Sequence, residues 1–355
     1  MKLKELQNYL IKKNTGLALF FNLQTSDPNF FYFSQISNLS FACLAVSKEK
    51  KPILFVSLLD YERAKTESKL RVYCIKNKLS DFLINFLKKE KIKAKTIAVN
   101  KSNLTLNNFK ILKTKFKKLK FKDISDFCSQ LRAQKTEKEI ERITKACKIT
   151  DKALIEVLQN FKKFKTESQV EAQLNFLAKQ QFADMAFKTI VASGKNASFP
   201  HHETKNRPLQ KGFCIIDFGV KYKGYCSDIT RTIYIGKPKK SEKELYNLVL
   251  NSQLKAIKKL KQNVSCSEID KQARTELGKY KKFFIHGLGH GIGIEPHESP
   301  TLSSKSTDRL KQNMVFTVEP GIYLPHKLGI RIEDVILLGK KVKILTRTTK
   351  NLITI

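Results

Sequence analysis

A single aspartate interrupts one of the most apolar runs in this chain, and any fold must account for it. Asp217 stands in the string CIIDFG, whose other residues are typical of a buried strand. Burying a carboxylate is costly unless it pairs with a cation or binds a metal ion. We therefore expect a positive partner for Asp217 inside the folded chain.

A second aspartate, Asp228, follows 11 residues later. We interpret residues 213–236 as one long β-hairpin. A turn centred between Tyr222 and Lys223 would set the two aspartates directly opposite each other, with Cβ atoms about 5 Å apart. Like charges at this spacing repel unless cations lie between them, and two divalent ions about 3.5–4 Å apart would fit. With another register, the two carboxylates would face different partners.

Two glutamates repeat this arrangement downstream. Glu319 lies in VEPGIY and Glu333 in GIRIED, 14 residues apart. Their even spacing about His326 lets a hairpin bring both side chains to one face. A second acidic pair between apolar residues strengthens the metal-site interpretation of the first.

All six histidines follow residue 200. His290 stands in HGLGHGIGIEPHESP, where four glycines let the backbone approach closely and adopt positive φ. A neutral imidazole can bind a metal there, and mixed carboxylate and imidazole donors suit Mn, Fe, Co or Zn. His286 is either a participant or a satisfied core residue, whereas His326 is interpreted as a loop residue and His202 as a neighbour of the site.

The chain is predicted to divide near residue 130. Before it, short apolar runs alternate with helical patterns, which indicates an α/β domain. After it, Thr136 and Glu139 form a predicted capping box for a long helix that reaches about Phe161. The predicted strands are 17–21, 41–46, 53–57 and 97–100, and the other predicted helices are 3–11, 61–69, 82–89, 167–181, 243–261 and 267–279.

The composition is strongly basic, with 68 Lys+Arg against 32 Asp+Glu and a formal net charge of +36. Residues 91–122 hold 11 lysines and no acidic residue. This segment is either a nucleic-acid-binding face or a solvated helix face in which Phe109, Leu112, Phe116 and Leu119 point to the core. We favour the solvated face, and expect non-specific contact with polyanions at low salt in either case.

Seven scattered cysteines without a CxxC pair argue against a disulfide framework and favour a reducing compartment. No apolar run approaches the roughly 18 residues of a membrane span. The first residues lack the unbroken apolar run of an export signal. We therefore expect a cytoplasmic protein that makes no membrane contact.

The chain thus carries five candidate ligands in the order Asp217, Asp228, His290, Glu319 and Glu333. With these residues in this order, the sequence resembles the M24 metallopeptidase family, whose fold is called pita-bread. The strings IIDFG, GYCSDITRT, GHGIGIEPHE, VEPGIY and GIRIED carry the resemblance. SFPH, LRAQKTEKE and DPNFFY extend it toward the start of the chain. The resemblance implies an α/β (α+β) fold, with a creatinase-type N-terminal α/β domain over residues 1–130 and a pita-bread catalytic domain over residues 131–355.

The resemblance also implies two divalent metal ions per chain. By the family's pattern, Asp217 binds one ion, His290 and Glu319 bind the other, and Asp228 and Glu333 bridge both. Manganese is the expected metal, with cobalt, zinc or iron as alternatives.

Further roles follow from the same resemblance. A water or hydroxide between the ions is the implied nucleophile, and Glu319 is the implied proton shuttle. His297 would stabilise the tetrahedral intermediate or the scissile carbonyl, and His201 would orient the substrate. Arg331 would anchor a substrate carboxylate or, alternatively, form a salt bridge with Asp334 or a ligand glutamate.

The implied activity is hydrolysis of Xaa-Pro bonds, either in dipeptides (prolidase) or at the N-terminus of longer peptides (aminopeptidase P). The implied partners are proline-containing peptides and a second copy in a homodimer. We expect Phe187 and Tyr225 to contribute to an apolar proline pocket. Two alternatives remain open: a creatinase-like or other amidase on the same scaffold, and a metal-free relative that binds protein or RNA.

Overall fold

The computed structural model describes residues 2–23, 26–76, 78–89 and 94–355. It divides into two compact units, Met1–Leu131 and Arg132–Ile355. Among the described residues, no helix is both long enough and apolar enough to cross a bilayer.

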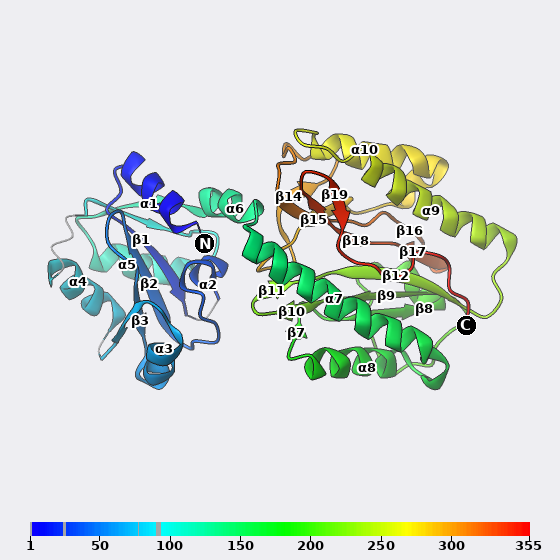
Figure 1. Cartoon of the computed structure of the whole chain (residues 1–355), viewed down its shortest axis with the longest axis horizontal. Helices are drawn as coiled ribbons and strands as arrows, with labels where there is room; N and C mark the ends of the chain where they lie inside the picture. Colours follow the sequence, from blue (N-terminus) through cyan, green and yellow to red (C-terminus); the bar gives the residue numbers. More distant parts are fainter. Residues whose placement is uncertain (1, 24–25, 77, 90–93) are drawn as a thin grey trace. The chain divides into compact units, whose positions relative to one another are not determined.

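The first unit is a mixed sheet with helices packed against it (Figure 1). Its strands are β1 (Leu17–Asn22), β2 (Ala42–Ser47), β3 (Ile53–Val56), β4 (Arg71–Cys74), β5 (Thr96–Val99) and β6 (Lys120–Asp123). Its helices are α1 (Leu3–Lys12), α2 (Pro28–Ser34), η1 (Leu58–Asp60), α3 (Tyr61–Glu67), α4 (Leu79–Lys89), α5 (Leu106–Lys115) and the connecting α6 (Ser125–Ala133). The strands lie in the order β4-β3-β2-β1-β5-β6.

The predicted strands and helices of this unit are confirmed, with slightly shifted ends. Those strands, β1, β2, β3 and β5, are buried along their whole length, which is why their sequences are continuous apolar runs. The strands β4 and β6 were not predicted. They are edge strands with exposed charged residues, so their sequences lack a continuous apolar run. Helix α2 escaped because Pro28 resembles a breaker, although proline suits the first turn of a helix capped by Asp27.

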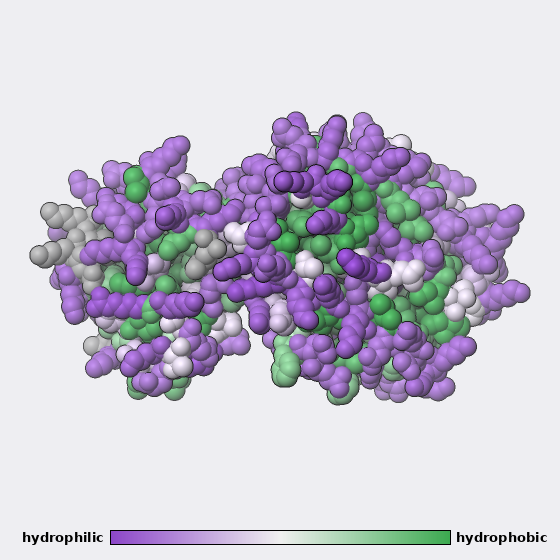
Figure 2. All heavy atoms as spheres, viewed as in Figure 1, coloured by the Kyte–Doolittle hydropathy of each residue, from purple (hydrophilic) through white to green (hydrophobic). Residues whose placement is uncertain are grey.

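The described part of the lysine-rich segment forms β5, α5 and most of the edge strand β6. Leu112 and Phe116 are buried while Lys110 and Lys113 are exposed, as the solvated-face interpretation predicts. Leu119 lies beyond the end of the helix. Residues 91–93 lie outside the described residues, and contact with polyanions stays a prediction. Hydrophilic side chains cover much of the visible face of each unit in Figure 2.

The second unit places helices on two sides of its strands (Figure 1). The helices are α7 (Glu137–Gln159), η2 (Phe161–Lys163), α8 (Glu167–Gln180), η3 (Gly194–Ser198), α9 (Lys240–Lys258), α10 (Cys266–Leu277) and η4 (Gly278–Phe283). The strands are β7 (Asp184–Met185), β8 (Ile190–Ser193), β9 (Gly212–Phe218), β10 (Val220–Tyr222), β11 (Tyr225–Cys226), β12 (Ile229–Ile235), β13 (Gly289–Gly291), β14 (Glu298–Leu302), β15 (Met314–Val318), β16 (Gly321–Leu324), β17 (Leu328–Arg331), β18 (Asp334–Leu338) and β19 (Val342–Ile344). The predicted capping box at Thr136 is present, and the four long helices are confirmed.

The first predicted hairpin forms, but its register is shifted. Strand β9 pairs with β12 so that Asp217 faces Thr230 rather than Asp228. Tyr222 pairs with Tyr225, which centres the turn between Lys223 and Gly224. Both turn residues have positive φ, as a tight hairpin turn requires, and glycine adopts this conformation most easily. The prediction of directly opposed aspartates was therefore wrong, although a shift of two residues keeps both on one face.

The second hairpin has the predicted register. Gly321 pairs with Arg331, and Leu324 pairs with Leu328, about a turn at His326. The same register continues from β16 and β17 into β15 and β18, where Val318 faces Asp334. Glu319 and Glu333 are therefore opposite each other, at the break between two ladder segments.

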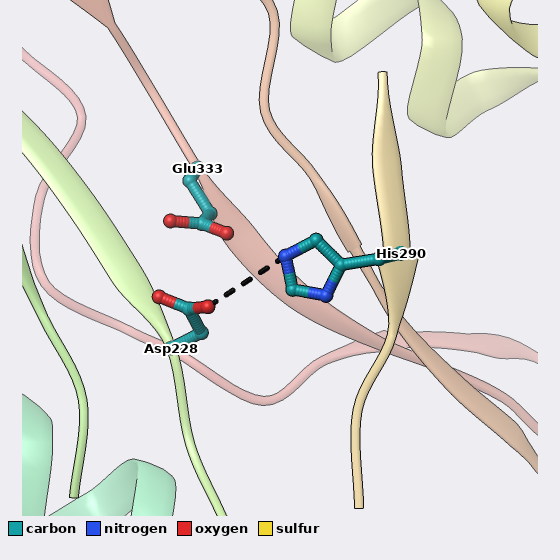
Figure 3. Close-up of side chains that lie close together, drawn as sticks. All are labelled: Asp228, His290 and Glu333. Atoms are coloured by element: carbon teal, nitrogen blue, oxygen red, sulfur yellow. Dashed lines mark ion pairs between the residues drawn. The ribbon is translucent and has the colours of Figure 1, made fainter. Parts of the chain in front are cut away.

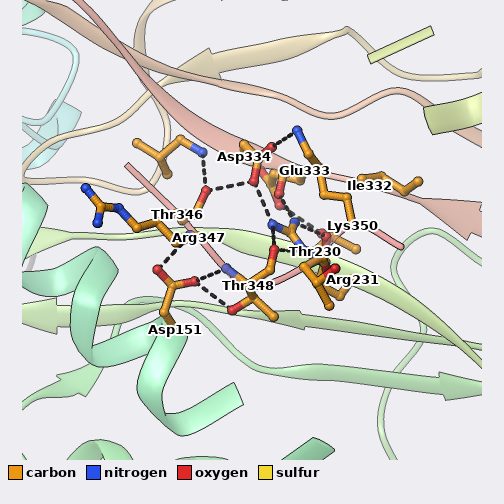
Figure 4. A network of polar contacts seen from close by, with 12 residues as sticks. Asp151, Thr230, Arg231, Ile332, Glu333, Asp334, Thr346, Arg347, Thr348 and Lys350 are labelled. Atoms are coloured by element: carbon orange, nitrogen blue, oxygen red, sulfur yellow. Dashed lines mark hydrogen bonds and ion pairs between the residues drawn. The ribbon is translucent and has the colours of Figure 1, made fainter. Parts of the chain in front are cut away.

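A buried ionic network ties this hairpin to the first one (Figure 4). Arg231, whose side chain is 2% exposed, donates from Nη2 to Asp334 Oδ1 at 2.7 Å and from Nη1 to the backbone oxygen of Glu333 at 2.5 Å. Asp334 also accepts hydrogen bonds from Thr346 Oγ1 at 2.9 Å and Lys350 Nζ at 2.8 Å. The network therefore fixes the backbone at Glu333.

Replacing Asp334 by alanine should lower the free energy of unfolding by about 3–5 kcal/mol, because it leaves the buried guanidinium of Arg231 without its charge partner. Urea denaturation in the presence of EDTA measures this loss. The exposed ion pair of Asp184 with Lys179 supplies the control. Asp184→Ala should change stability by less than about 1 kcal/mol. Equal losses in the two variants would contradict the importance of the network.

Candidate metal centre

The five predicted metal-binding residues lie far apart in the sequence but line one cavity of about 640 Å³. Asp217 lies on β9 and His290 on β13, whereas Asp228, Glu319 and Glu333 stand at strand ends. The remaining predicted site residues line the same cavity: His201, His297 and Arg331. The structure thus brings all eight together.

Asp228, His290 and Glu333 form the centre of this group (Figure 3). Each contributes one potential ligand atom, and these atoms all lie within 4.8 Å of one another. His290 Nε2 is 3.8 Å from Asp228 Oδ2 and 3.2 Å from Glu319 Oε1. Three side chains that converge at this spacing can share a metal ion.

Several carboxylate oxygens at the site are buried and unsatisfied. Among the described residues, Asp217 Oδ1, Asp228 Oδ1 and Glu333 Oε1 have no hydrogen-bond partner. Buried carboxylate oxygens are costly unless something positive satisfies them. Carboxylate oxygens together with one imidazole are a donor set that divalent ions such as Mn²⁺ or Zn²⁺ accept. The residues present therefore fit a divalent metal.

The electrostatics agree with this fit. Burial, followed by the nearby charges of Glu333 and Asp217, raises the pKa of Asp228 well above its usual range. Burial, followed by the charges of Glu319 and Asp217, does the same to the pKa of Glu333. Two neighbouring carboxyls with raised pKa values mark a place where the protein alone supplies too little positive charge.

Glu319 behaves differently because it pairs with the histidine. Burial acts against it, but the hydrogen bond and charge of His290 lower the pKa of Glu319 to about 2. Burial likewise opposes the protonation of His290, yet the hydrogen bond and charge of Glu319 raise its pKa to about 9. Without metal, the two side chains form an ion pair in the cavity.

Close backbone approach positions His290. Its backbone N–H donates to Thr317 Oγ1 at 3.1 Å, and Thr317 Oγ1 donates to Glu319 Oε1 at 3.1 Å. A Cβ atom on Gly289 would lie 2.0 Å from the backbone oxygen of Thr317. Only glycine fits there, which confirms the predicted close approach. Thr317 itself was missed, because nothing in its sequence context distinguishes it from other strand threonines.

Arg331 pairs with Asp217 and not with the partners predicted for it. Its Nη2 donates to Asp217 Oδ2 at 2.6 Å, and its Nη1 donates to the hydroxyl of Tyr323 at 2.7 Å. Asp334 pairs with Arg231 instead. Residues 331 and 334 are an odd number of positions apart, so in an extended segment their side chains point to opposite faces. Tyr323 was also missed, although the hairpin register places it diagonally across from Arg331 on the same face.

The remaining histidines differ in their surroundings and therefore in their expected roles. The ring centroid of His297 lies 3.9 Å from that of His290. His286 Nδ1 donates to the backbone oxygen of Gly287 at 2.8 Å, and its Nε2 lies 3.0 Å from the Tyr323 hydroxyl. Burial lowers the pKa of His286, so it stays neutral with both ring nitrogens satisfied. His326 lies in the hairpin turn, as predicted.

Of the two aromatic residues expected in a proline pocket, one lies in the wall of this cavity. Phe187 lines the cavity, whereas Tyr225 is not among its lining residues. Tyr225 is buried elsewhere, with its hydroxyl 3.3 Å from Glu139 Oε1 and its ring below Arg142. Its bond to the N-terminal turn of α7 explains its position.

The ion pair predicts how the metal-free protein responds to pH. The folded-state pKa of His290, about 9, lies above its ordinary value of about 6.5, so its stabilising contribution is full below pH 6.5 and is lost as the pH rises through 9. The raised pKa values of Asp228 and Glu333 act in the same direction. Glu319, with a pKa of about 2, is ionised throughout and adds no slope.

Scanning calorimetry of EDTA-treated protein should therefore give a lower Tm at pH 9 than at pH 6.5. The His290→Asn variant is the control, and the fall should be smaller in it. A Tm that stays constant or rises between these pH values in the unsubstituted protein would contradict the described ion pair.

Comparison with known proteins agrees with this geometry. Residues 141–340 match the pattern of metallopeptidase family M24, and residues 2–134 match the creatinase/prolidase N-terminal domain. An Xaa-Pro dipeptidase of Pyrococcus horikoshii is 37% identical over 357 residues, which cover 99% of this chain and 98% of that protein.

Solved structures match over nearly the whole chain. The prolidase from Pyrococcus horikoshii superposes with a TM-score of 0.90 at 35% identity, covering 99% of each chain. An X-Pro aminopeptidase from Thermotoga maritima superposes with a TM-score of 0.92 at 33% identity, covering 100% of this chain and 99% of that one. These matches confirm the predicted fold class, a creatinase-type N-terminal domain followed by a pita-bread catalytic domain, and the chain belongs to metallopeptidase family M24.

Proposed function

We propose that this metallopeptidase hydrolyses the Xaa-Pro bond of dipeptides with the help of two divalent metal ions. The observation that carries the proposal is the single cavity in which the five predicted metal ligands meet and three buried carboxylate oxygens lack a hydrogen-bond partner among the described residues. The name of the P. horikoshii relative, Xaa-Pro dipeptidase, supports the substrate class. The similar structure from T. maritima is named an X-Pro aminopeptidase, so cleavage of longer Xaa-Pro peptides is the second candidate activity.

In this proposal Asp217 would hold the first ion, His290 and Glu319 would hold the second, and Asp228 and Glu333 would be shared between them. Asp217 Oδ2 accepts a hydrogen bond from Arg331, so Oδ1 is the carboxylate oxygen left to bind a metal. One available oxygen suits a residue that binds a single ion. The central position of Asp228 and Glu333 suits bridging. The predominance of carboxylates favours manganese, with cobalt, zinc or iron as alternatives.

When bound, the ions supply Lewis acidity and a water whose pKa is lowered toward neutrality. Glu319, which would also hold an ion, would accept a proton on its carboxylate and pass it to the leaving amine. Burial lowers the pKa of His297, which keeps its ring a neutral donor for the oxygen of the scissile carbonyl. His201, at the cavity wall, orients the substrate.

Arg331 is proposed to orient Asp217 and not to bind a substrate carboxylate. Its Nε and both Nη atoms already donate to protein groups: Asp217, Tyr323, Thr230 and the backbone oxygen of Pro200. A guanidinium with these bonds has little capacity left for a ligand.

We further propose the division into an N-terminal domain (residues 1–130) and a catalytic domain (residues 131–355), supported by the two compact units. A cytoplasmic location fits the seven cysteines, which form no disulfide among the described residues and are mostly buried. A homodimer fits the exposed Leu58 and Leu59, since apolar surface of this kind is typically covered by a partner.

Substrate class is tested with purified protein loaded with Mn²⁺. It should release alanine from Ala-Pro. EDTA should abolish the release, because the five proposed ligands take part in catalysis only by holding the metal. Ala-Pro-Ala and Ala-Ala are assayed beside it. Cleavage of Ala-Pro-Ala alone would replace the dipeptidase by an aminopeptidase. Cleavage of none of them by metal-loaded protein would overturn the proposal and favour another amidase.

The ligand assignment is tested with Asp228→Asn. This change should reduce turnover at least about 100-fold and lower the metal bound per chain, because it removes one charged ligand from the centre. Equilibrium dialysis against Mn²⁺ followed by elemental analysis measures the binding. Asp184→Asn, at an exposed position, is the control and should change neither quantity. Full turnover and full metal content in Asp228→Asn would show the assignment to be wrong.

A further inference from the structure

His201 stands on a tight turn at the edge of the cavity. The backbone N–H of His202 donates to the oxygen of Phe199 at 3.1 Å and closes this turn. Arg331 Nη1 donates to the backbone oxygen of Pro200 at 3.3 Å. His201 itself is exposed and has no hydrogen bond or ion pair to another side chain of the described chain. Its position therefore depends on how the turn is held.

Glu167, the first residue of α8, holds the segment that leads into this turn. Its side chain is 0% exposed. Its Oε1 accepts hydrogen bonds from the backbone N–H of Ser193 at 2.8 Å, from Ser193 Oγ at 2.9 Å and from Asn196 Nδ2 at 3.0 Å. Three donors saturate Oε1 and leave Oε2 for a fourth.

His202 supplies that fourth hydrogen bond. Its Nε2 lies 2.9 Å from Glu167 Oε2, and its side chain is 10% exposed. Across the described residues, no other side chain donates to this oxygen. A buried carboxylate is a strong acceptor, so the bond is short and directional. It joins the turn that carries His201 to the start of α8.

We propose that His202 is a positioning residue, which holds His201 at the cavity wall through its hydrogen bond to the buried carboxylate of Glu167. The inference rests on the proposed function, in which His201 orients the substrate. Beyond the turn, Thr204 is also fixed, since its Oγ1 accepts from the backbone N–H of Val191 at 2.9 Å. The bond of His202 is thus the anchor made by the side chain that directly follows His201, while Arg331 holds the residue before it.

The first test compares two substitutions at His202. His202→Ala removes the donor, whereas His202→Gln keeps an N–H at nearly the place of Nε2. With Ala-Pro as substrate, His202→Ala should lower kcat/KM about tenfold, and His202→Gln should recover most of the loss. Failure of His202→Gln to recover any of it would overturn the role of the hydrogen bond.

The second test is a double-mutant cycle with His201→Ala. If His202 acts through His201, His202→Ala should have no further effect on kcat/KM in the His201→Ala background. The same factor in both backgrounds would show that His202 contacts the substrate directly or stabilises the fold in general, and would overturn the inference.

A third readout does not depend on catalysis. Hydrogen exchange of the backbone amides at residues 199–204 should be faster in His202→Ala and restored in His202→Gln. Unchanged exchange would overturn the inference even if the proposed function holds. If the unsubstituted protein cleaves no Xaa-Pro peptide, the proposed function fails while exchange still decides whether His202 anchors the turn. If His202→Ala does not fold, Glu167→Gln replaces it, with faster exchange expected.

Discussion

Repulsion among buried carboxylates is the constraint around which the catalytic unit is arranged. Asp217, Asp228 and Glu333 line one cavity, and each has an oxygen without a described hydrogen-bond partner. The protein supplies two cations beside them, Arg331 and a protonated His290, and these pair with Asp217 and Glu319. The positive charge beside Asp228 and Glu333 is too small to keep their pKa values in the usual range, and a divalent metal centre would supply what is missing.

Two interrupted hairpins bring these groups together. Each hairpin keeps one register on both sides of a break, and the break coincides with an acidic pair or one of its members. A carboxylate at a break is released from ladder pairing, while the ladders on either side keep it in place. The Arg231–Asp334 ion pair then joins the two hairpins directly behind Glu333. The ionic network and the metal site thus lie on opposite faces of the same strand end.

Spacing was enough to place each acidic pair on a common face and to predict one hairpin register, because the pairing of strand positions determines the face of a side chain. The assignment of these residues as metal ligands came from the resemblance to family M24 and remains a prediction. The first register differs from the prediction by two positions because Lys223 and Gly224 both adopt positive φ, which centres the turn one residue further along the chain. Partners that are distant in the sequence were beyond reach: Arg331 with Asp217, and His202 with Glu167. These contacts depend on how strands and helices pack, which no local pattern encodes.

In the proposed metal centre, the cavity holds two divalent ions between the five residues Asp217, Asp228, His290, Glu319 and Glu333. Anomalous diffraction at the manganese absorption edge, from crystals grown with Mn²⁺, would locate these ions. We expect two anomalous peaks in this cavity, both beside Asp228 and Glu333. A single peak would contradict the dinuclear site, and peaks confined to other parts of the surface would contradict the metal centre itself.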